Sequence, residues 1–146
     1  MTVSGSAALA LTSEMWVGYN GSGTLNLNGG SITQSGQYFV VGNSANPGVY
    51  TQTAGTYTFT GNNNSYIGNG NSGTGTMTVS GGSFTQTLGQ MFLGQNGTAQ
   101  GTLTIGGGGA PASVTLPTLR FGNNSAAASG TVNLNANGTL VAGTVN

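Results

Sequence analysis

The sequence predicts an all-β fold, a right-handed parallel β-solenoid of about five three-sided coils, each about 26 residues long. Three observations lead to this prediction: a glycine anchor at nearly constant spacing, a second anchor in phase with it, and alternating apolar and polar residues between turns rich in Gly and Asn. The main alternative, an antiparallel sheet or barrel, would show hairpin turns about every 8 to 12 residues and no long period.

The two anchors stay in phase over the whole chain. The first is Gly-Thr followed by apolar, polar and apolar residues; it begins at Gly23, Gly75, Gly101 and Gly130, with a degenerate copy at Gly48. The second is an apolar residue followed by glycine, with glycines spaced 24, 26, 26 and 28 residues apart at Gly18, Gly42, Gly68, Gly94 and Gly122. A third element, Gly-Ser/Thr-apolar-Thr, lies between them at Gly30, Gly55 and Gly82.

Each repeat is expected to form one coil. About 26 residues at about 3.3 Å each close into three short strands and three corners, and adjacent coils pair about 4.8 Å apart. We expect one domain over 1–146, with coils at 1–22, 23–47, 48–74, 75–100 and 101–129 and a partial coil at 130–146. Helical periodicity occurs only from Ala7 to Met15, which aligns without gaps with Ser83 to Met91 and is therefore predicted as strand.

The inward residues are predicted to be the apolar ones that recur in register, because stacked coils bury a continuous narrow core. The first strand of each coil supplies Leu25, Leu27, Met77, Val79, Leu103, Ile105, Val132 and Leu134. The second supplies Ile32, Tyr57, Phe84, Val114 and Leu140. The third supplies Met15, Val17, Phe39, Val41, Ile67, Met91, Leu93, Leu119 and Phe121.

The composition argues against several functions. Charged residues make up 1% of the chain, against roughly 25% in typical soluble proteins. With one base, Arg120, one acid, Glu14, and no His or Cys, phosphate binding and metal ligation lack their usual side chains. No apolar stretch approaches the roughly 20 residues of a membrane helix. We expect no nucleic-acid partner, no membrane span, no metal and no cofactor.

Catalysis is also not expected. Glycoside hydrolysis normally uses two carboxylates, whereas Glu14 and Arg120 lie four coils apart, about 19 Å on the coil spacing. The sequence therefore predicts that the protein is not an enzyme and has no catalytic residues. Because little net charge is present to keep it soluble in the cytosol, its surface must be hydrated by amides and hydroxyls, and we expect an extracellular or cell-surface location.

The segment Gly75-Thr-Met-Thr-Val-Ser-Gly-Gly-Ser-Phe-Thr85 resembles the β-strand repeats of large bacterial secreted proteins. These include autotransporter passengers and repetitive surface proteins with a C-terminal sorting signal. The resemblance extends over nearly the whole chain. It implies an extracellular parallel β-helix with an adhesive or structural role, and it supplies no catalytic residues.

Both ends of the chain repeat internal strand sequences. Residues 1–5 are identical to Met77–Gly81, and 143–146 copy Gly130–Asn133, which predicts that each end stops in or at the start of a strand. Open strand edges favour polymerisation. The expected partner is a second copy stacked head to tail into a fibre or surface layer, or a continuation of the same longer chain, through the edge residues Met1, Thr2, Val3, Gly143, Thr144, Val145 and Asn146.

Two further surfaces are candidates for binding. An outward stripe is formed by the residues just before the inward anchors: Trp16, Val40, Tyr66, Phe92 and Arg120. The stripe is either a lateral or glycan-binding contact, as in the stalk or passenger segment of a bacterial adhesin, or its side chains are turned partly inward or shielded by a loop. A hydroxyl ladder is predicted at Thr33, Thr58, Thr60, Thr85, Thr87 and Thr115. The ladder resembles the Thr-x-Thr faces of ice-binding solenoids, although Thr is also a common solvent-facing strand residue.

Overall fold

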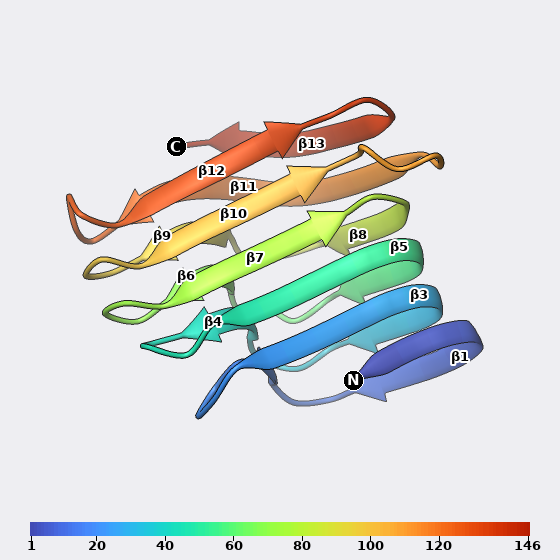
Figure 1. Cartoon of the computed structure of the whole chain (residues 1–146), viewed down its shortest axis with the longest axis horizontal. Coiled ribbons are helices and arrows are strands. Elements are labelled where there is room, and N and C mark those ends of the chain that lie inside the picture. The colour runs from blue at the N-terminus through green and yellow to red at the C-terminus, as the bar shows by residue number, and fades with distance from the viewer.

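A computed structural model of the chain describes every residue from Met1 to Asn146. It contains strands and turns but no helix, and the strands stack into coils that climb from the N-terminus to the C-terminus (Figure 1). All named strand pairs are parallel. The predicted β-solenoid is confirmed, with coils of about 26 residues and about 6 turns.

The solenoid has three faces, which we call A, B and C. Face A consists of the first halves of β1 (Thr2–Leu11), β3 (Gly23–Gln34) and β5 (Gly48–Phe59), with β7 (Thr74–Val79), β10 (Gln100–Ile105) and β12 (Ser129–Leu134). Face B consists of the second halves of β1, β3 and β5, with β8 (Gly82–Gln86), the first half of β11 (Ala112–Asn123) and β13 (Gly138–Val145). Face C consists of β2 (Met15–Val17), β4 (Phe39–Asn43), β6 (Ser65–Asn69), β9 (Met91–Gln95) and the second half of β11.

Pairing between coils places equivalent residues in rows along the axis, and the inward rows form the core. The predicted inward residues of the middle coils are buried, and Phe39, Tyr50, Tyr57 and Phe84 form a cluster of rings inside the coils. Exceptions lie in the end coils, which are covered on one side only. Leu134 is 56% exposed and Phe121 is 37% exposed, although both belong to inward rows.

Two register predictions are wrong. Leu9, not Ala8, lies in the row of Ile32, Tyr57 and Phe84, so the gapless alignment of Ala7–Met15 is displaced by one residue within the strand. The difference is absorbed in the corner between faces B and C, where 12–14 occupy the place of 87–90 in the later coil. Strand ladders fix the rows, whereas corner residues have no such ladder and tolerate a deletion.

The copy of the first anchor at Gly143 does not start a strand of face A. Thr144 and Val145 are the end of β13 and pair with Thr118 and Leu119, where the chain passes from face B to face C. The reason is distance along the chain. Gly143 follows Gly130 by only half a coil, so an identical short sequence falls on a different face.

The two anchors meet at one corner, between faces C and A. The second-anchor glycines all have positive φ, from +54° at Gly122 to +85° at Gly18. A Cβ at Gly68 would lie 2.2 Å from the carbonyl oxygen of Gln100 in the next coil, and one at Gly75 would lie 2.3 Å from the amide nitrogen of Gly68. Glycine is required here by backbone conformation and by the close approach of neighbouring backbone.

Candidate functional site

Few chemically reactive side chains lie close together in the structure. No set of three or more His, Cys, Asp or Glu side chains lies close enough together to hold a metal ion. Separately, none of its segments forms a helix long and apolar enough to cross a membrane. The surfaces that remain as candidates are the outward row on face C, the hydroxyls of face B and the two end coils.

The five stripe residues form one continuous row on face C, which we call the aromatic row. Trp16 pairs with Val40, Val40 with Tyr66, Tyr66 with Phe92, and Phe92 with Arg120. Flanking residues such as Phe39 and Val41 are completely buried in the core. Strand alternation therefore directs the row away from the core.

The rings of this row pack on one another along the axis. Tyr66 and Phe92 are stacked at 5.4 Å between centroids with an interplanar angle of 17°, and Arg120 Cζ lies 5.8 Å from the centroid of Phe92. Phe92 thus has one neighbour from the coil below and one from the coil above. Such stacking and cation–π contacts stabilise adjacent coils.

Although the row points outward, its middle is shielded from solvent. Phe92 is 4% exposed and Val40 is 1% exposed, and Tyr38 packs beside Tyr66 at 6.0 Å. The open part lies at the N-terminal end, where Tyr19 is 52% exposed and meets Trp16 edge to face at 4.8 Å. The central ring faces are therefore occupied by their neighbours and are not free to stack on a ligand.

The predicted hydroxyl ladder separates into two rows. Thr33, Thr58, Thr85 and Thr115 pair consecutively across face B. Thr60 and Thr87 instead follow the ends of β5 and β8, where their hydroxyls donate to the carbonyl oxygens of Gln34 and Phe59 in the preceding coil. The second pair links coils at a corner and is not part of a flat array.

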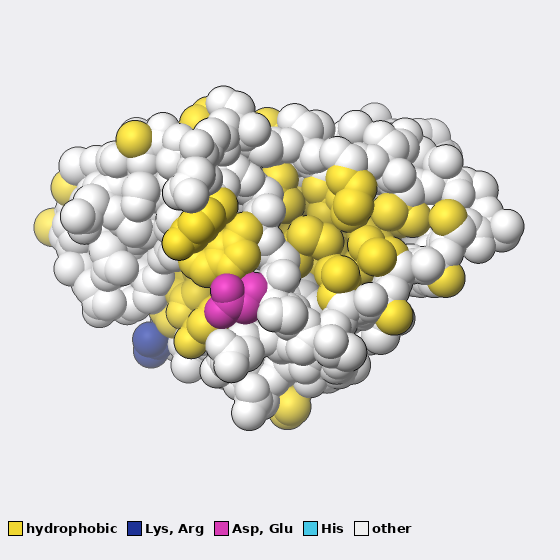
Figure 2. Space-filling view, turned by 90° about the horizontal axis from the view of Figure 1, so that it is seen from below, with side chains coloured by type: hydrophobic (Ala, Val, Ile, Leu, Met, Phe, Trp, Pro, Cys, Tyr) yellow, Lys and Arg dark blue, Asp and Glu magenta, His cyan; other side chains and the backbone are white.

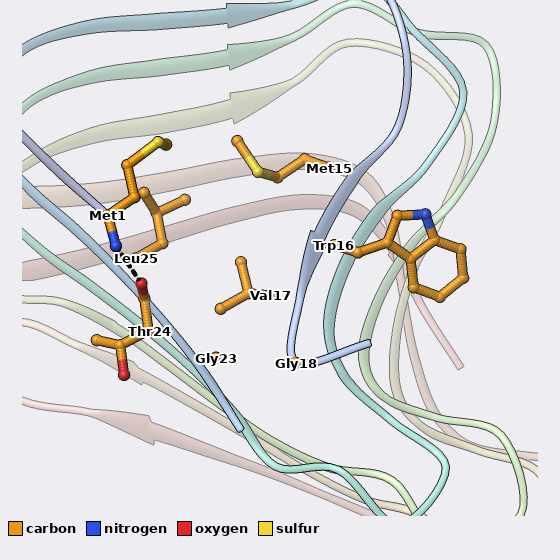
Figure 3. Close-up of a pocket in the computed structure, with 8 residues that line it drawn as sticks. All are labelled: Met1, Met15, Trp16, Val17, Gly18, Gly23, Thr24 and Leu25. Atoms are coloured by element: carbon orange, nitrogen blue, oxygen red, sulfur yellow. Dashed lines mark hydrogen bonds between the residues drawn. The ribbon is translucent and has the colours of Figure 1, made fainter. Parts of the chain in front are cut away.

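The N-terminal coil leaves the interior of the solenoid open. A cavity of about 200 Å³ lies there, lined by side chains that include Met1, Met15, Val17 and Leu25. Figure 3 shows these four converging on the opening while Trp16 points away on the other side of β2. In the view along the axis from this end, apolar side chains fill a hollow in the surface (Figure 2).

The C-terminal coil is open in the same way. Leu134 on face A and Val145 at the end of β13 are 56% and 60% exposed. A second hollow of about 190 Å³ is lined by Arg120, Phe121, Asn123 and Asn146. Each end therefore presents unpaired strand edges together with apolar side chains of the core.

The two ends match row by row. One inward row begins at Val3 and ends at Leu134 on face A. The corresponding rows run from Leu9 to Leu140 on face B and from Met15 to Val145 on face C. If a second copy were stacked on the C-terminal coil with its strands in continued register, its first apolar residue in each row would lie over the last apolar residue of the same row, on all three faces.

Three glutamines, which the apolar pattern of the sequence did not predict as inward residues, are buried inside the coils. Gln34, Gln52 and Gln86 are completely or almost completely buried. The Tyr50 hydroxyl donates to Gln52 Oε1 at 2.8 Å, and Gln52 Nε2 donates to the carbonyl oxygens of Gly55 and, one coil higher, Ser83. The sequence contained a signal for the burial of Gln52, because this residue occupies an inward position of the degenerate anchor that begins at Gly48.

The other two glutamines follow the same pattern. Tyr57 donates to Gln34 Oε1 at 2.6 Å and Ser65 donates to Gln86 Oε1 at 2.6 Å, while each amide nitrogen donates to a backbone carbonyl. Burial raises the pKa of the Tyr50 and Tyr57 hydroxyls well above the ordinary value, and the neighbouring Tyr50 adds to the effect at Tyr57. These hydroxyls act as neutral donors that fix the packing of the middle coils.

No protein-family model matches the chain, and neither a curated protein nor a solved structure matches it significantly. The resemblance noted in the sequence is supported by the structure at the level of a parallel β-solenoid.

Proposed function

We propose that this chain is an extracellular structural protein, a β-solenoid subunit whose end coils pair head to tail with further copies to form a fibre or surface layer. The observation that carries the proposal is the matching of the two ends, in which the three rows Val3 to Leu134, Leu9 to Leu140 and Met15 to Val145 all begin and end with apolar residues. A contact of this kind is heterologous and does not close, so it generates a filament.

The composition supports the same proposal. With 1% charged residues, adjacent copies have little repulsion to overcome at their ends. The outer positions carry hydroxyls and amides, which remain hydrated at any pH that an external surface meets. An extracellular location and a relationship to bacterial surface repeats are part of this proposal and rest on the composition and on the sequence resemblance.

Electron microscopy and sedimentation of the purified chain test the proposal. We expect unbranched filaments with an axial repeat of about 29 Å, which is six coils at about 4.8 Å each. Particles that stay monomeric at high concentration would overturn the proposal.

A matched pair of variants tests which surface is used. Val145→Glu places a charge on the exposed end of an inward row and should abolish filaments, because the next copy would bury an unpaired carboxylate. Val49→Glu makes the same change on the outer side of face A, where Val49 is 39% exposed, and should leave filaments intact. Equal behaviour of the two variants would overturn the assignment of the end coils.

The alternative is a stalk or passenger segment of an adhesin that binds glycans through the aromatic row. Its support is the open aromatic pair Trp16 and Tyr19 at one end of the row. The stacked rings at Tyr66 and Phe92 lend it less support, because their faces are already covered. Glycan-array binding that is lost in Tyr19→Ser and retained in Thr58→Ser would favour this alternative over a purely structural role.

A further inference from the structure

The only two charged side chains lie toward opposite ends of the solenoid, Glu14 in the corner just before face C and Arg120 on face C. Glu14 precedes β2 in the first coil, and its Oε2 accepts a hydrogen bond of 2.7 Å from Trp16 Nε1, which holds the carboxylate beside the aromatic row. Arg120 lies in that row four coils higher. Within one copy, four coil spacings keep them about 19 Å apart.

Head-to-tail stacking would bring these two charges together. Beyond Arg120, one further level of face C is occupied by Asn146, which exchanges backbone hydrogen bonds with Leu119 and Phe121. The next copy continues the row with its own Trp16 and the adjacent Glu14. Glu14 of one copy then lies two coil spacings along the axis and two residues along the strand from the position of Arg120 of the other, a backbone separation of about 12 Å. The long side chains of Arg and Glu can bridge this separation.

We infer that Glu14 of one copy and Arg120 of the next form an ion pair that fixes how the copies are rotated about the axis. This inference rests on the proposed head-to-tail stacking. All three faces offer parallel strand edges and apolar rows, and they differ in strand length, from three residues in β2 to six in β10. A single acid beside face C at one end and a single base on face C at the other add a preference for the alignment that places C on C.

Around this contact, Arg120 is the only basic side chain and Glu14 the only acidic one. The Met1 amine donates to the Thr24 carbonyl oxygen at 2.8 Å, at the start of face A. The backbone oxygen of Asn146 accepts a hydrogen bond from the Phe121 amide, one level beyond Arg120. Arg120→Glu would place two acidic side chains, at position 120 of one copy and at position 14 of the next, on the two sides of the contact.

A charge-swap experiment tests the inference. Arg120→Glu should raise the critical concentration for filament assembly several-fold, up to about tenfold, and addition of Glu14→Arg should restore it. Because positions 14 and 120 are four coils apart in one copy, rescue arises only from contact between copies. Loss of the Arg120–Phe92 contact within a copy is not repaired by Glu14→Arg.

The control is Thr115→Glu, which adds a negative charge in the same coil but on face B; it should change the critical concentration by less than about twofold. The effect of Arg120→Glu should vanish near 1 M salt, where the Debye length is about 3 Å. If the unmodified chain does not assemble, the proposed function fails together with the ion pair. If the chain assembles and Arg120→Glu has no effect or is not rescued, only the ion pair is overturned.

Discussion

The corner glycines allow the strongest test of how this sequence specifies its coils. In Gly68→Ala, two separate costs arise. The residue has φ of +77°, and an alanine in this left-handed region costs about 1–2 kcal/mol. Its Cβ would also lie 2.2 Å from the Gln100 carbonyl oxygen and 2.6 Å from its carbonyl carbon, and this backbone of the next coil cannot move without breaking the ladder. Overpacking adds about 1–3 kcal/mol, which gives a total of about 2–5 kcal/mol.

Two glycines in one loop separate these costs. Gly107 has φ of +81° but only side-chain atoms of Asn135 near its Cβ position, the closest at 3.4 Å, so Gly107→Ala should cost about 1–2 kcal/mol. Gly109 has no atom within 4 Å of that position and no positive φ, so Gly109→Ala should be neutral or stabilise by up to about 1 kcal/mol. Urea unfolding followed by circular dichroism gives the three free energies. If Gly68→Ala costs within about 0.5 kcal/mol of Gly107→Ala, the close backbone approach at this corner has no energetic effect and the prediction is wrong.

Three further predictions concern the core and the aromatic row. Gln52→Leu removes the hydrogen bonds of the Gln52 amide with the Tyr50 hydroxyl and with two backbone carbonyls, and should lower the free energy of unfolding by about 1–3 kcal/mol. In a double-mutant cycle Tyr50→Phe should recover part of this loss, and strictly additive values would contradict the hydrogen bond. The free energy of unfolding should fall above pH 10, because Tyr50 and Tyr57 ionise in the unfolded chain but stay protonated in the folded one. Melting temperatures measured against pH should reflect a decrease of about 2.7 kcal/mol per pH unit, which Tyr50→Phe should about halve. An unchanged slope in that variant would count against the raised pKa values. Phe92→Ala removes a ring that is 4% exposed and stacked on Tyr66, and should lower the free energy of unfolding by about 3 kcal/mol. A decrease below about 1 kcal/mol in thermal or urea unfolding would show that the aromatic row does not stabilise the fold.

Much of the fold could be predicted because its signals are local and repeated. Alternation set the inward rows, so Leu27, Val79 and Ile105 were assigned to the core and are completely buried. The anchor glycines recur because each coil makes the same close backbone approach at the same corner. A requirement that repeats every coil leaves a period in the sequence, and that period predicts the architecture.

The candidate surfaces were predicted less completely. Strand alternation directs Phe92 to the opposite side of the strand from Met91 and Leu93, but its burial depends on Tyr66 and Arg120 in adjacent coils, about 26 residues away in each direction. The hydroxyl ladder was predicted as one array, yet Thr60 and Thr87 turn to the backbone of the preceding coil. Exposure is set by neighbours along the axis, and alternation within one strand carries no information about them.

The repeat and the alternation of apolar and polar residues specify the class of fold, the coil length and most of the inward rows, and the composition shows the near absence of charge. The one-residue shift at Leu9, the face on which Gly143 falls, and the pairing of Gln52 with Tyr50 and with the coil above are visible only in the folded coils. The folded coils also place Glu14 beside the aromatic row, at the opposite end of the stack from Arg120. Periodicity specifies which way a side chain points, whereas contacts between coils specify what it meets there.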